Sequence, residues 1–238
     1  TRVSSDAQTR KYTFIKKRGE IEIMINLHCH TYFSDGILGP AELLTRCIKK
    51  RYRAVALTDH IDESNFENVL KNVKKVTDEF NKSLNFRALC GAELTYVLPK
   101  NIDKIAKECR KLGAEIIVVH GETLVEPVPE ETNIYAAQSK NIDIIAHPGL
   151  ICSKSVKYAK KNNISLEITS RKGHSLSNGY VANIAQQYDI NMVISTDAHC
   201  PEDLIDENFA MQVLIGAGLT KKSIINLWKN MIRLAGLK

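Results

Sequence analysis

Seven short apolar runs, separated by helical patterns, constrain the fold of this chain more than any other feature of its sequence. Each run is four to seven residues long and most are rich in Ile, Val or Leu, which is typical of a buried strand rather than of a helix. The runs are Ile21–Leu27, Ala54–Leu57, Phe86–Leu89, Glu115–Val119, Ile142–Ala146, Ile164–Ile168 and Asn191–Ser195. Several are apolar without alternation, as expected of parallel strands covered on both faces.

The segments between the runs carry the apolar period of amphipathic helices. The predicted helices are Pro40–Lys50, Asn65–Phe80, Ile102–Leu112, Glu130–Ser139, Lys154–Asn162 and Asn178–Tyr188. The strand starts recur every 22 to 33 residues, close to the ~30 residues of a βαβ unit. With no Pro/Gly/Ser-rich linker in the chain, this rhythm predicts a single α/β domain built as a closed parallel barrel, with an open doubly wound sheet as the alternative.

The last helical pattern, Lys221–Leu234, places five apolar residues on one face. Exposed apolar stripes are uncommon on soluble monomers, so we expect this helix to close the barrel rather than to lie on a membrane or a partner.

The charge of the chain lies mainly at its ends. The formal net charge is +6, with +4 on residues 1–20, +5 on residues 219–238 and −3 on the body between them. We therefore expect residues 1–20 to form a basic N-terminal arm and residues 21–238 to form the barrel. Nucleic acid is a possible partner but is not favoured, because a binder driven by charge would carry it on the body.

Two further absences bear on location. No apolar run approaches the ~18 residues of a membrane span, and the first residues show no signal-peptide core. The expectation is a cytoplasmic protein with no membrane partner, whose oligomeric state the sequence leaves open.

Six of the seven histidines end or closely follow one of the apolar runs. They are His28, His30, His60, His120, His147 and His199. Three acidic residues hold similar places: Glu93 follows the third run, Asp197 precedes His199 by two residues, and Asp35 lies in the loop after His30.

These positions predict a metal site. In a parallel barrel all strands end at the same face, so the side chains should converge although they span about 170 positions of sequence. The i, i+2 pairs His28/His30 and Asp197/His199 point alike in extended backbone. Neutral imidazoles with carboxylates suit zinc, manganese or iron. A single histidine after a strand is more often structural, but six in one topological position indicate a site.

The motifs around these residues resemble the PHP (polymerase and histidinol phosphatase) family. They are His28-Cys29-His30-Thr31, Ser34-Asp35-Gly36, Thr58-Asp59-His60, Gly91-Ala92-Glu93, Val119-His120-Gly121, Ala146-His147-Pro148 and Thr196-Asp197-Ala198-His199. They follow the family order and cover about residues 23–200. The resemblance implies a distorted (β/α)7 TIM-like barrel with two or three divalent transition metals (Zn, Mn or Fe) at its carboxyl mouth.

Carried over position by position, the resemblance also implies the ligand sets. His28, His30, Glu93 and Asp197 would bind one metal, with Glu93 as the bridging carboxylate to a second metal at His120 and His147. Asp35, His60 and His199 would complete a third or shared position. Many members have His where this chain has Asp35.

The implied activity is metal-dependent phosphoester hydrolysis by a metal-activated hydroxide. We expect a phosphatase acting on histidinol phosphate or another small phosphorylated metabolite. A nuclease or phosphodiesterase acting on nucleotides or DNA ends is the alternative, and a non-catalytic RNA-binding subunit is less favoured because every ligand position is filled.

The remaining histidine lies in the loop after the sixth run, Glu167–Ser175. Arg171 offers a bidentate fork for phosphate oxygens, as an Arg near this strand does in family members. His174 is a candidate general acid, and His199 or His60 could protonate the leaving oxygen if not bound to metal. A solvated polar loop is the alternative for this stretch.

Overall fold

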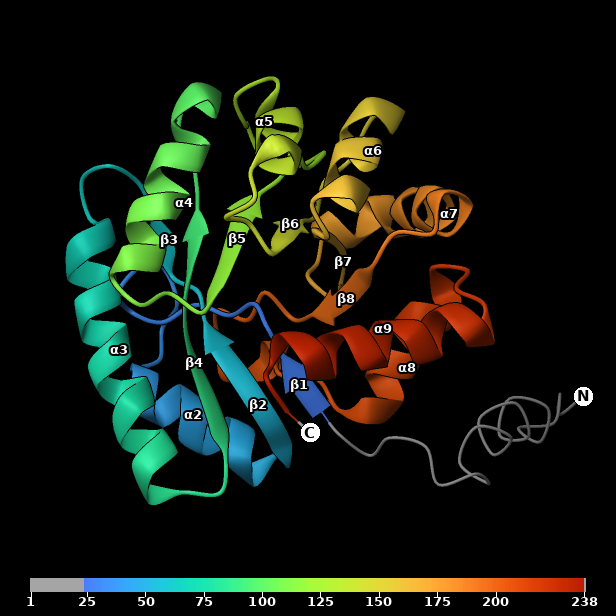
Figure 1. Ribbon diagram of the computed structural model, residues 1–238. Helices are drawn as coiled ribbons and strands as arrows, with labels where there is room; N and C mark the ends of the chain where they lie inside the picture. Colours follow the sequence, from blue (N-terminus) through green and yellow to red (C-terminus); the bar gives the residue numbers. More distant parts are fainter. Residues whose placement is uncertain (1–23, 238) are drawn as a thin grey trace, which may run out of the picture.

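A parallel sheet forms the centre of the structure (Figure 1). The computed structural model describes residues 24–237. Its strands are β1 (Met24–Asn26), β2 (Tyr52–Leu57), β4 (Arg87–Leu94), β5 (Ile116–His120), β6 (Ile144–Ala146), β7 (Ser165–Thr169) and β8 (Met192–Ser195), hydrogen-bonded in this order. Within the described residues every pairing is parallel, and the two-residue strand β3 (His60–Ile61) continues the line of β2 along β4.

The first and last strands meet at their carboxyl ends. The His30 N–H donates to the Ala198 carbonyl over 2.8 Å, and the Asp197 N–H donates to the His28 carbonyl over 3.0 Å. These bonds bring the sheet close to a ring of seven strand lines, which confirms the predicted distorted (β/α)7 barrel. They also join the two ends of the sheet where the histidines were expected.

Helices cover the outside of the strands (Figure 1). They are α2 (Pro40–Lys49), α3 (Phe66–Ser83), α4 (Ile102–Lys111), α5 (Thr132–Gln138), α6 (Ser153–Lys161), α7 (Asn178–Tyr188), α8 (Glu207–Gly216) and α9 (Lys221–Leu234), with 3-10 turns η1 (Pro99–Asn101), η2 (His174–Ser177) and η3 (Pro201–Asp203). In α4, for example, Ile102, Ile105, Ala106 and Cys109 are buried while the other face is charged. Burial of such stripes on the sheet holds each helix in place.

The last helix closes the barrel, as its pattern predicts. Ile224, Leu227, Trp228 and Met231 of α9 are buried, and the helix packs against β8. None of the helices within residues 24–237 is both long and apolar enough to cross a membrane.

The structure departs from the sequence prediction at one helix and at the end of one strand. Helix α8 was missed because its apolar residues are spread around it: Ala210 and Leu214 are buried while Phe209 and Ile215 are exposed. The strand predicted to end at Leu89 continues to Leu94, so Glu93 lies inside β4 rather than after it. Of the predicted strand Ile21–Leu27, the described part forms β1, Met24–Asn26; residues 21–23 and the predicted arm 1–20 lie outside the described residues.

Candidate metal centre

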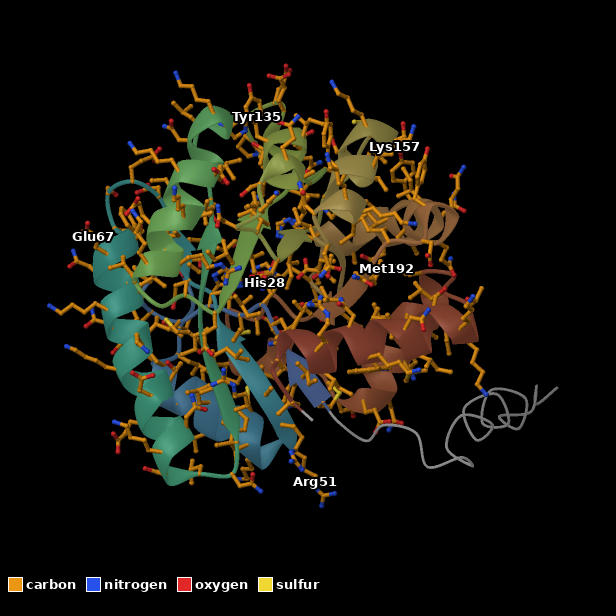
Figure 2. The ribbon with its side chains drawn as sticks, viewed as in Figure 1. His28, Arg51, Glu67, Tyr135, Lys157 and Met192 are labelled. Atoms are coloured by element: carbon orange, nitrogen blue, oxygen red, sulfur yellow. The ribbon has the colours of Figure 1, made fainter. Side chains whose placement is uncertain are left out.

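Histidine and carboxylate side chains converge at the carboxyl ends of the strands. Figure 2 shows His28 near the middle of the molecule, far from labelled surface residues such as Glu67 and Lys157. His28 and His30 follow β1 and are 0% and 1% exposed. Their Nε2 atoms lie 3.1 Å apart, so the i, i+2 pair points to one place as expected.

The first group joins these two histidines to two buried carboxylates. His28 Nε2 lies 3.2 Å from Glu93 Oε1, and His30 Nε2 lies 3.1 Å from Asp197 Oδ1. His28 Nε2 is also 3.7 Å from Asp197 Oδ1. His28, His30 and Glu93 each bring one donor atom within 4.8 Å of the others, and so do His28, His147 and Asp197. Either set of nitrogen and oxygen donors could hold a divalent ion.

The second group contains three histidines. His120, His147 and His174 each bring one ring nitrogen within 4.8 Å of the others. His147 Nε2 lies 3.7 Å from Glu93 Oε1, which places Glu93 between the first and second groups. The sequence predicted His120 and His147 here; His174 was predicted as a general acid instead.

The third group surrounds Asp35 near the pocket. Its Oδ1 lies 3.1 Å from His199 Nε2, 3.5 Å from His60 Nε2 and 3.9 Å from His30 Nδ1. The four residues together could hold one ion. His30 therefore belongs to both the first group and the third.

Buried polar atoms without partners test whether these residues suit metals. In the described residues, Glu93 Oε1, His120 Nδ1 and His147 Nδ1 are buried and accept or donate no hydrogen bond. A purely structural cluster would pair such atoms, because each unpaired one costs about 1–3 kcal/mol. The donor set and these open atoms fit divalent transition metals.

A carboxylate outside the three groups orients two of the ligands. Glu167 lies in β7 and is fully buried. Its Oε1 lies 2.8 Å from His28 Nδ1, and its Oε2 accepts the His147 backbone N–H over 3.0 Å. A carboxylate on Nδ1 keeps a proton there, so that Nε2 can offer its lone pair to an ion at the centre once the proton on Nε2 is lost.

A second buried carboxylate holds the loop that carries Asp35. Asp59 accepts the Thr31 N–H over 2.7 Å and the hydroxyls of Thr31 and Ser34 over 2.9–3.0 Å. The loop between β1 and α2 is thereby fixed against the end of β2.

Burial and the neighbouring charges shift the pKa values in opposite directions. Burial lowers the pKa of His28, but Glu93, Glu167 and Asp197 outweigh it and the pKa rises well above its ordinary value. Burial and the nearby His120 hold the pKa of His147 well below its usual range. Burial would raise the pKa of Glu93, but His28 and His60 lower it strongly. Glu93 is therefore a carboxylate and His147 a neutral imidazole, the forms that bind metals.

The backbone is bent sharply at two of these residues. His147 has φ 27° and Asp197 has φ 49°, a left-handed conformation that costs non-glycine residues of order 1–3 kcal/mol. Between β5 and β6, Gly121 allows a close approach, since a Cβ there would lie 2.3 Å from the Ala146 carbonyl oxygen. The fold thus accepts local strain to bring His120 and His147 together.

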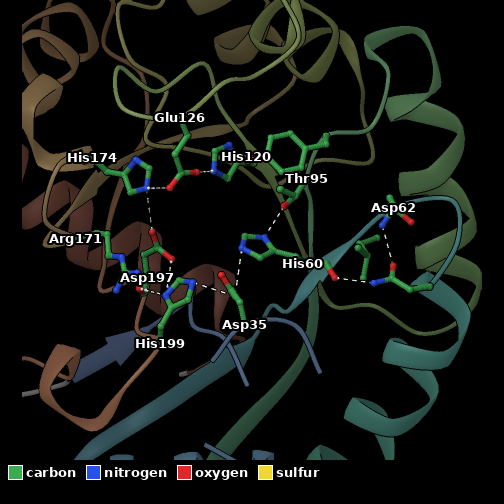
Figure 3. Close-up of a pocket in the computed structure, with 13 residues that line it drawn as sticks. Asp35, His60, Asp62, Thr95, His120, Glu126, Arg171, His174, Asp197 and His199 are labelled. Carbon is green, nitrogen blue, oxygen red and sulfur yellow. Dashed lines mark hydrogen bonds and ion pairs between the residues drawn. The ribbon is translucent and has the colours of Figure 1, made fainter. Parts of the chain in front are cut away.

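A pocket opens beside the three groups (Figure 3). Its volume is about 290 Å³, and Asp35, His60, His120, His174 and His199 contribute to its lining. Arg171 also lines it; its Nη1 donates to Asp203 Oδ2 over 2.9 Å. Asp203 accepts the His199 N–H as well, over 2.9 Å, so the guanidinium is tied to the loop after β8.

All the predicted site residues lie in this region. The nine predicted ligands meet in the three groups, and Arg171 and His174 line the adjacent pocket; their roles stay predictions. Sequence reasoning missed Glu167, Glu126, Asp203 and Thr123 as partners of these residues. The signal for Glu167 was visible, since it is a lone charge inside an apolar run, whereas Thr123 and Glu126 lie in a loop and Asp203 in the short turn η3, all of ordinary polarity.

The protein is a parallel β/α barrel whose imidazoles and carboxylates gather at the carboxyl ends of the strands. Proteins of this class could hold metal ions at that end of the barrel. The PHP domain model matches residues 26–147, slightly more than half of the chain. An uncharacterized protein of Methanocaldococcus jannaschii is 50% identical over 202 residues, 84% of this chain and 93% of that protein. The chain belongs to the PHP domain family.

Two more distant relatives carry functional names. The DNA polymerase/3'-5' exonuclease PolX of Bacillus subtilis is 28% identical over 86% of this chain, which spans 39% of PolX. A probable phosphatase of a Thermoanaerobacter species is 25% identical over 87% of this chain and 91% of its own length.

Solved structures show the same fold. A chain in the cryo-EM structure of an archaeal ribonuclease P with mature tRNA aligns with a TM-score of 0.65 and 16% identity, over 89% of this chain and 90% of that one. A candidate histidinol phosphatase of Listeria monocytogenes aligns with a TM-score of 0.55 and 11% identity, over 79% of this chain and 99% of that one. At these identities the likeness concerns the fold alone.

Proposed function

We propose that the protein is a metal-dependent phosphoesterase that hydrolyses a small phosphomonoester, such as histidinol phosphate or another phosphorylated metabolite. The observation that carries the proposal is the convergence of ten imidazole and carboxylate side chains at one barrel mouth, with buried polar atoms left unpaired. When bound, divalent ions there would neutralise phosphoryl oxygens and make hydroxide available at neutral pH.

The residues around the pocket supply binding and orientation. Arg171 would bind the phosphoryl oxygens, with Asp203 holding the guanidinium in the pocket wall. Glu93, which is fully buried, would hold ions from beneath the pocket, and Asp197 would hold them from the pocket wall. These groups would place the phosphorus atom between the histidine clusters and Arg171.

His199 is the proposed proton donor to the leaving oxygen when the third group holds no ion. It lines the pocket, and its Nε2 lies 3.1 Å from Asp35. Burial lowers its pKa, but hydrogen bonding to Asp35 and the charge of Asp197 raise it above the ordinary value. A raised pKa keeps an imidazole beside the pocket protonated to a higher pH than a free histidine, which suits general-acid catalysis.

The pocket favours a small substrate over a polyanion. Asp35, Asp62, Glu126 and Asp197 line it, against a single Arg171. Several phosphates of a nucleic acid would meet these carboxylates, whereas one phosphoryl group could reach Arg171 and the metal groups. The name of the Thermoanaerobacter relative agrees with a phosphatase.

A nuclease or phosphodiesterase of the same chemistry is the second candidate. The match to PolX over 86% of this chain favours it, and the exposed ring of Tyr96 in the pocket lining could stack on a base. A non-catalytic RNA-binding subunit is supported only by the ribonuclease P likeness in fold.

The test is a hydrolysis screen of the metal-loaded protein with zinc or manganese. Phosphomonoesters, a phosphodiester and single-stranded DNA are compared, with Glu93→Gln as the inactive variant and Glu67→Gln, an exposed position on α3, as its control. We expect monoester hydrolysis that Glu93→Gln abolishes and Glu67→Gln preserves. Cleavage of the diester or DNA alone would favour the second candidate, and no metal-dependent hydrolysis at all would overturn the proposal.

A further inference from the structure

We infer that His174 is a metal ligand, so that the second group is a three-histidine site which the carboxylate of Glu126 covers from the pocket side. The inference rests on the proposed function, because it concerns the same centre. It differs from the general-acid role that the sequence suggested for His174.

The position of the His174 ring supports ligation. The ring stacks on that of His147, with centroids 4.1 Å apart and planes 18° apart. It meets the ring of His120 edge-on at 5.9 Å. His174 Nε2 and His147 Nε2 lie 3.9 Å and 3.8 Å from the same oxygen, Asp197 Oδ2, so both nitrogens face one point.

The other ring nitrogen of His174 has a partner of its own. The Thr123 hydroxyl lies 2.6 Å from His174 Nδ1, and both side chains are buried. When Nδ1 donates its proton to that hydroxyl, Nε2 keeps its lone pair. Orientation of a ligating histidine through its second nitrogen is the usual arrangement around protein-bound metals.

Glu126 completes the group from the loop after β5. Its Oε2 lies 3.0 Å from His120 Nε2, and its Oε1 lies 3.4 Å from His174 Nε2. Figure 3 shows the carboxylate between the two rings. Its side chain is 42% exposed, unlike the buried carboxylates Glu93 and Asp197. Glu126 can therefore act as a fourth ligand that a substrate oxygen could replace.

This ligand set has a consequence for metal choice. Three neutral imidazoles and one carboxylate form the four-coordinate donor set that suits zinc and cobalt, whereas manganese and magnesium prefer oxygen-rich sites. The second position should therefore prefer zinc or cobalt over manganese or magnesium.

Cobalt spectroscopy of the full chain tests direct contact. We expect the His174→Cys variant loaded with Co²⁺ to show a thiolate-to-cobalt charge-transfer band that the wild-type protein lacks. Leu176→Cys is the matched control: Leu176 lies in the same turn η2 but is 71% exposed, so its thiol should give no such band. Absence of the band in a folded, cobalt-loaded His174→Cys protein would overturn the inference.

Metal titration against a competing chelator gives a second measurement. His174→Gln should weaken one of the bound zinc ions by more than about 10-fold, and Thr123→Val by about 10-fold to 100-fold, the range found when a histidine ligand loses its orienting partner. Glu126→Gln should weaken the same ion, whereas the exposed Glu130→Gln should not. Unchanged zinc affinity in His174→Gln would refute the inference and leave the proposed function intact, whereas a wild-type protein that binds no metal would refute both.

Discussion

Replacing Glu167 by glutamine isolates the role of an orienting carboxylate. Glu167 has no exposed surface, and each of its oxygens faces a different hydrogen-bond donor: His28 Nδ1 at 2.8 Å and the His147 backbone N–H at 3.0 Å. Glutamine keeps the shape but offers one acceptor and one NH₂ donor. The amide NH₂ must then face either the N–H of His28 Nδ1 or the His147 backbone N–H, unless His28 gives up its Nδ1 proton and carries a proton on Nε2 alone.

The structure sets the size of the effect. Loss of one hydrogen bond to a buried charge costs about 1.5–3 kcal/mol. If the amide oxygen of the Glu167→Gln variant still accepts the His147 N–H, the amide NH₂ faces His28 Nδ1, and a proton on His28 Nε2 would block the first metal group. Metal affinity should then fall by about 10-fold to 100-fold.

Two assays on the same variant separate these effects. Urea unfolding of the metal-free protein should show a loss of about 1.5–3 kcal/mol, and chelator competition should show the weaker metal binding. The control is Glu115→Gln, which breaks a partly exposed ion pair with Arg87 while the amide oxygen can still accept the Cys90 N–H, and it should cost about 0–1 kcal/mol. Wild-type metal affinity in Glu167→Gln would refute the assignment of Glu167 as an orienting residue.

Three further outcomes follow from the same geometry. Removing metal with a chelator should lower the melting temperature by about 5–10 °C, because ions at 100 times their dissociation constant add about 2.7 kcal/mol; an unchanged melting curve would argue against a metal centre. Arg171→Ala should weaken phosphate inhibition by about 1.5–3 kcal/mol, measured as the inhibition constant for inorganic phosphate, whereas Lys172→Ala, an exposed neighbour, should leave it unchanged. Metal loading near pH 7 should release protons, because the raised pKa values of His28 and His60 keep these rings protonated without metal. Calorimetry in buffers of different ionisation enthalpy measures the number of protons released. Release of no protons would mean that the rings are neutral and would contradict this prediction.

The barrel was predictable because its signal is repeated along the chain. Buried parallel strands need continuous apolar runs, and the runs fell on all seven principal strands. The carboxyl ends of the strands share one face of the barrel. The positions of His120 and His147 at the ends of their runs therefore predicted that the two side chains lie close together. The end of β4 was not predictable in this way, because Glu93 is a charge inside a buried strand and its cost is offset by histidines from other segments, with His28 and His60 nearest.

The partners of the ligands were harder to predict for a physical reason. Thr123 and Glu126 lie in the loop after β5, where no period constrains side-chain direction, and their contacts with His174 join residues about 50 positions apart. Such contacts depend on how two loops pack over the mouth. Sequence patterns report the direction of strands and helices but not the conformation of loops.

The charges in the centre explain why so many imidazoles are needed. Glu93, Glu167 and Asp197 are almost completely buried, and a buried carboxylate persists only when a positive charge lies beside it. In the metal-free chain protons must supply that charge, on His28 above all. A divalent ion supplies more charge at the same place and needs the neutral imidazoles that burial favours at His147. Protons and metal ions therefore compete for one set of nitrogens. The burial that makes uncompensated carboxylates costly also makes the centre select cations.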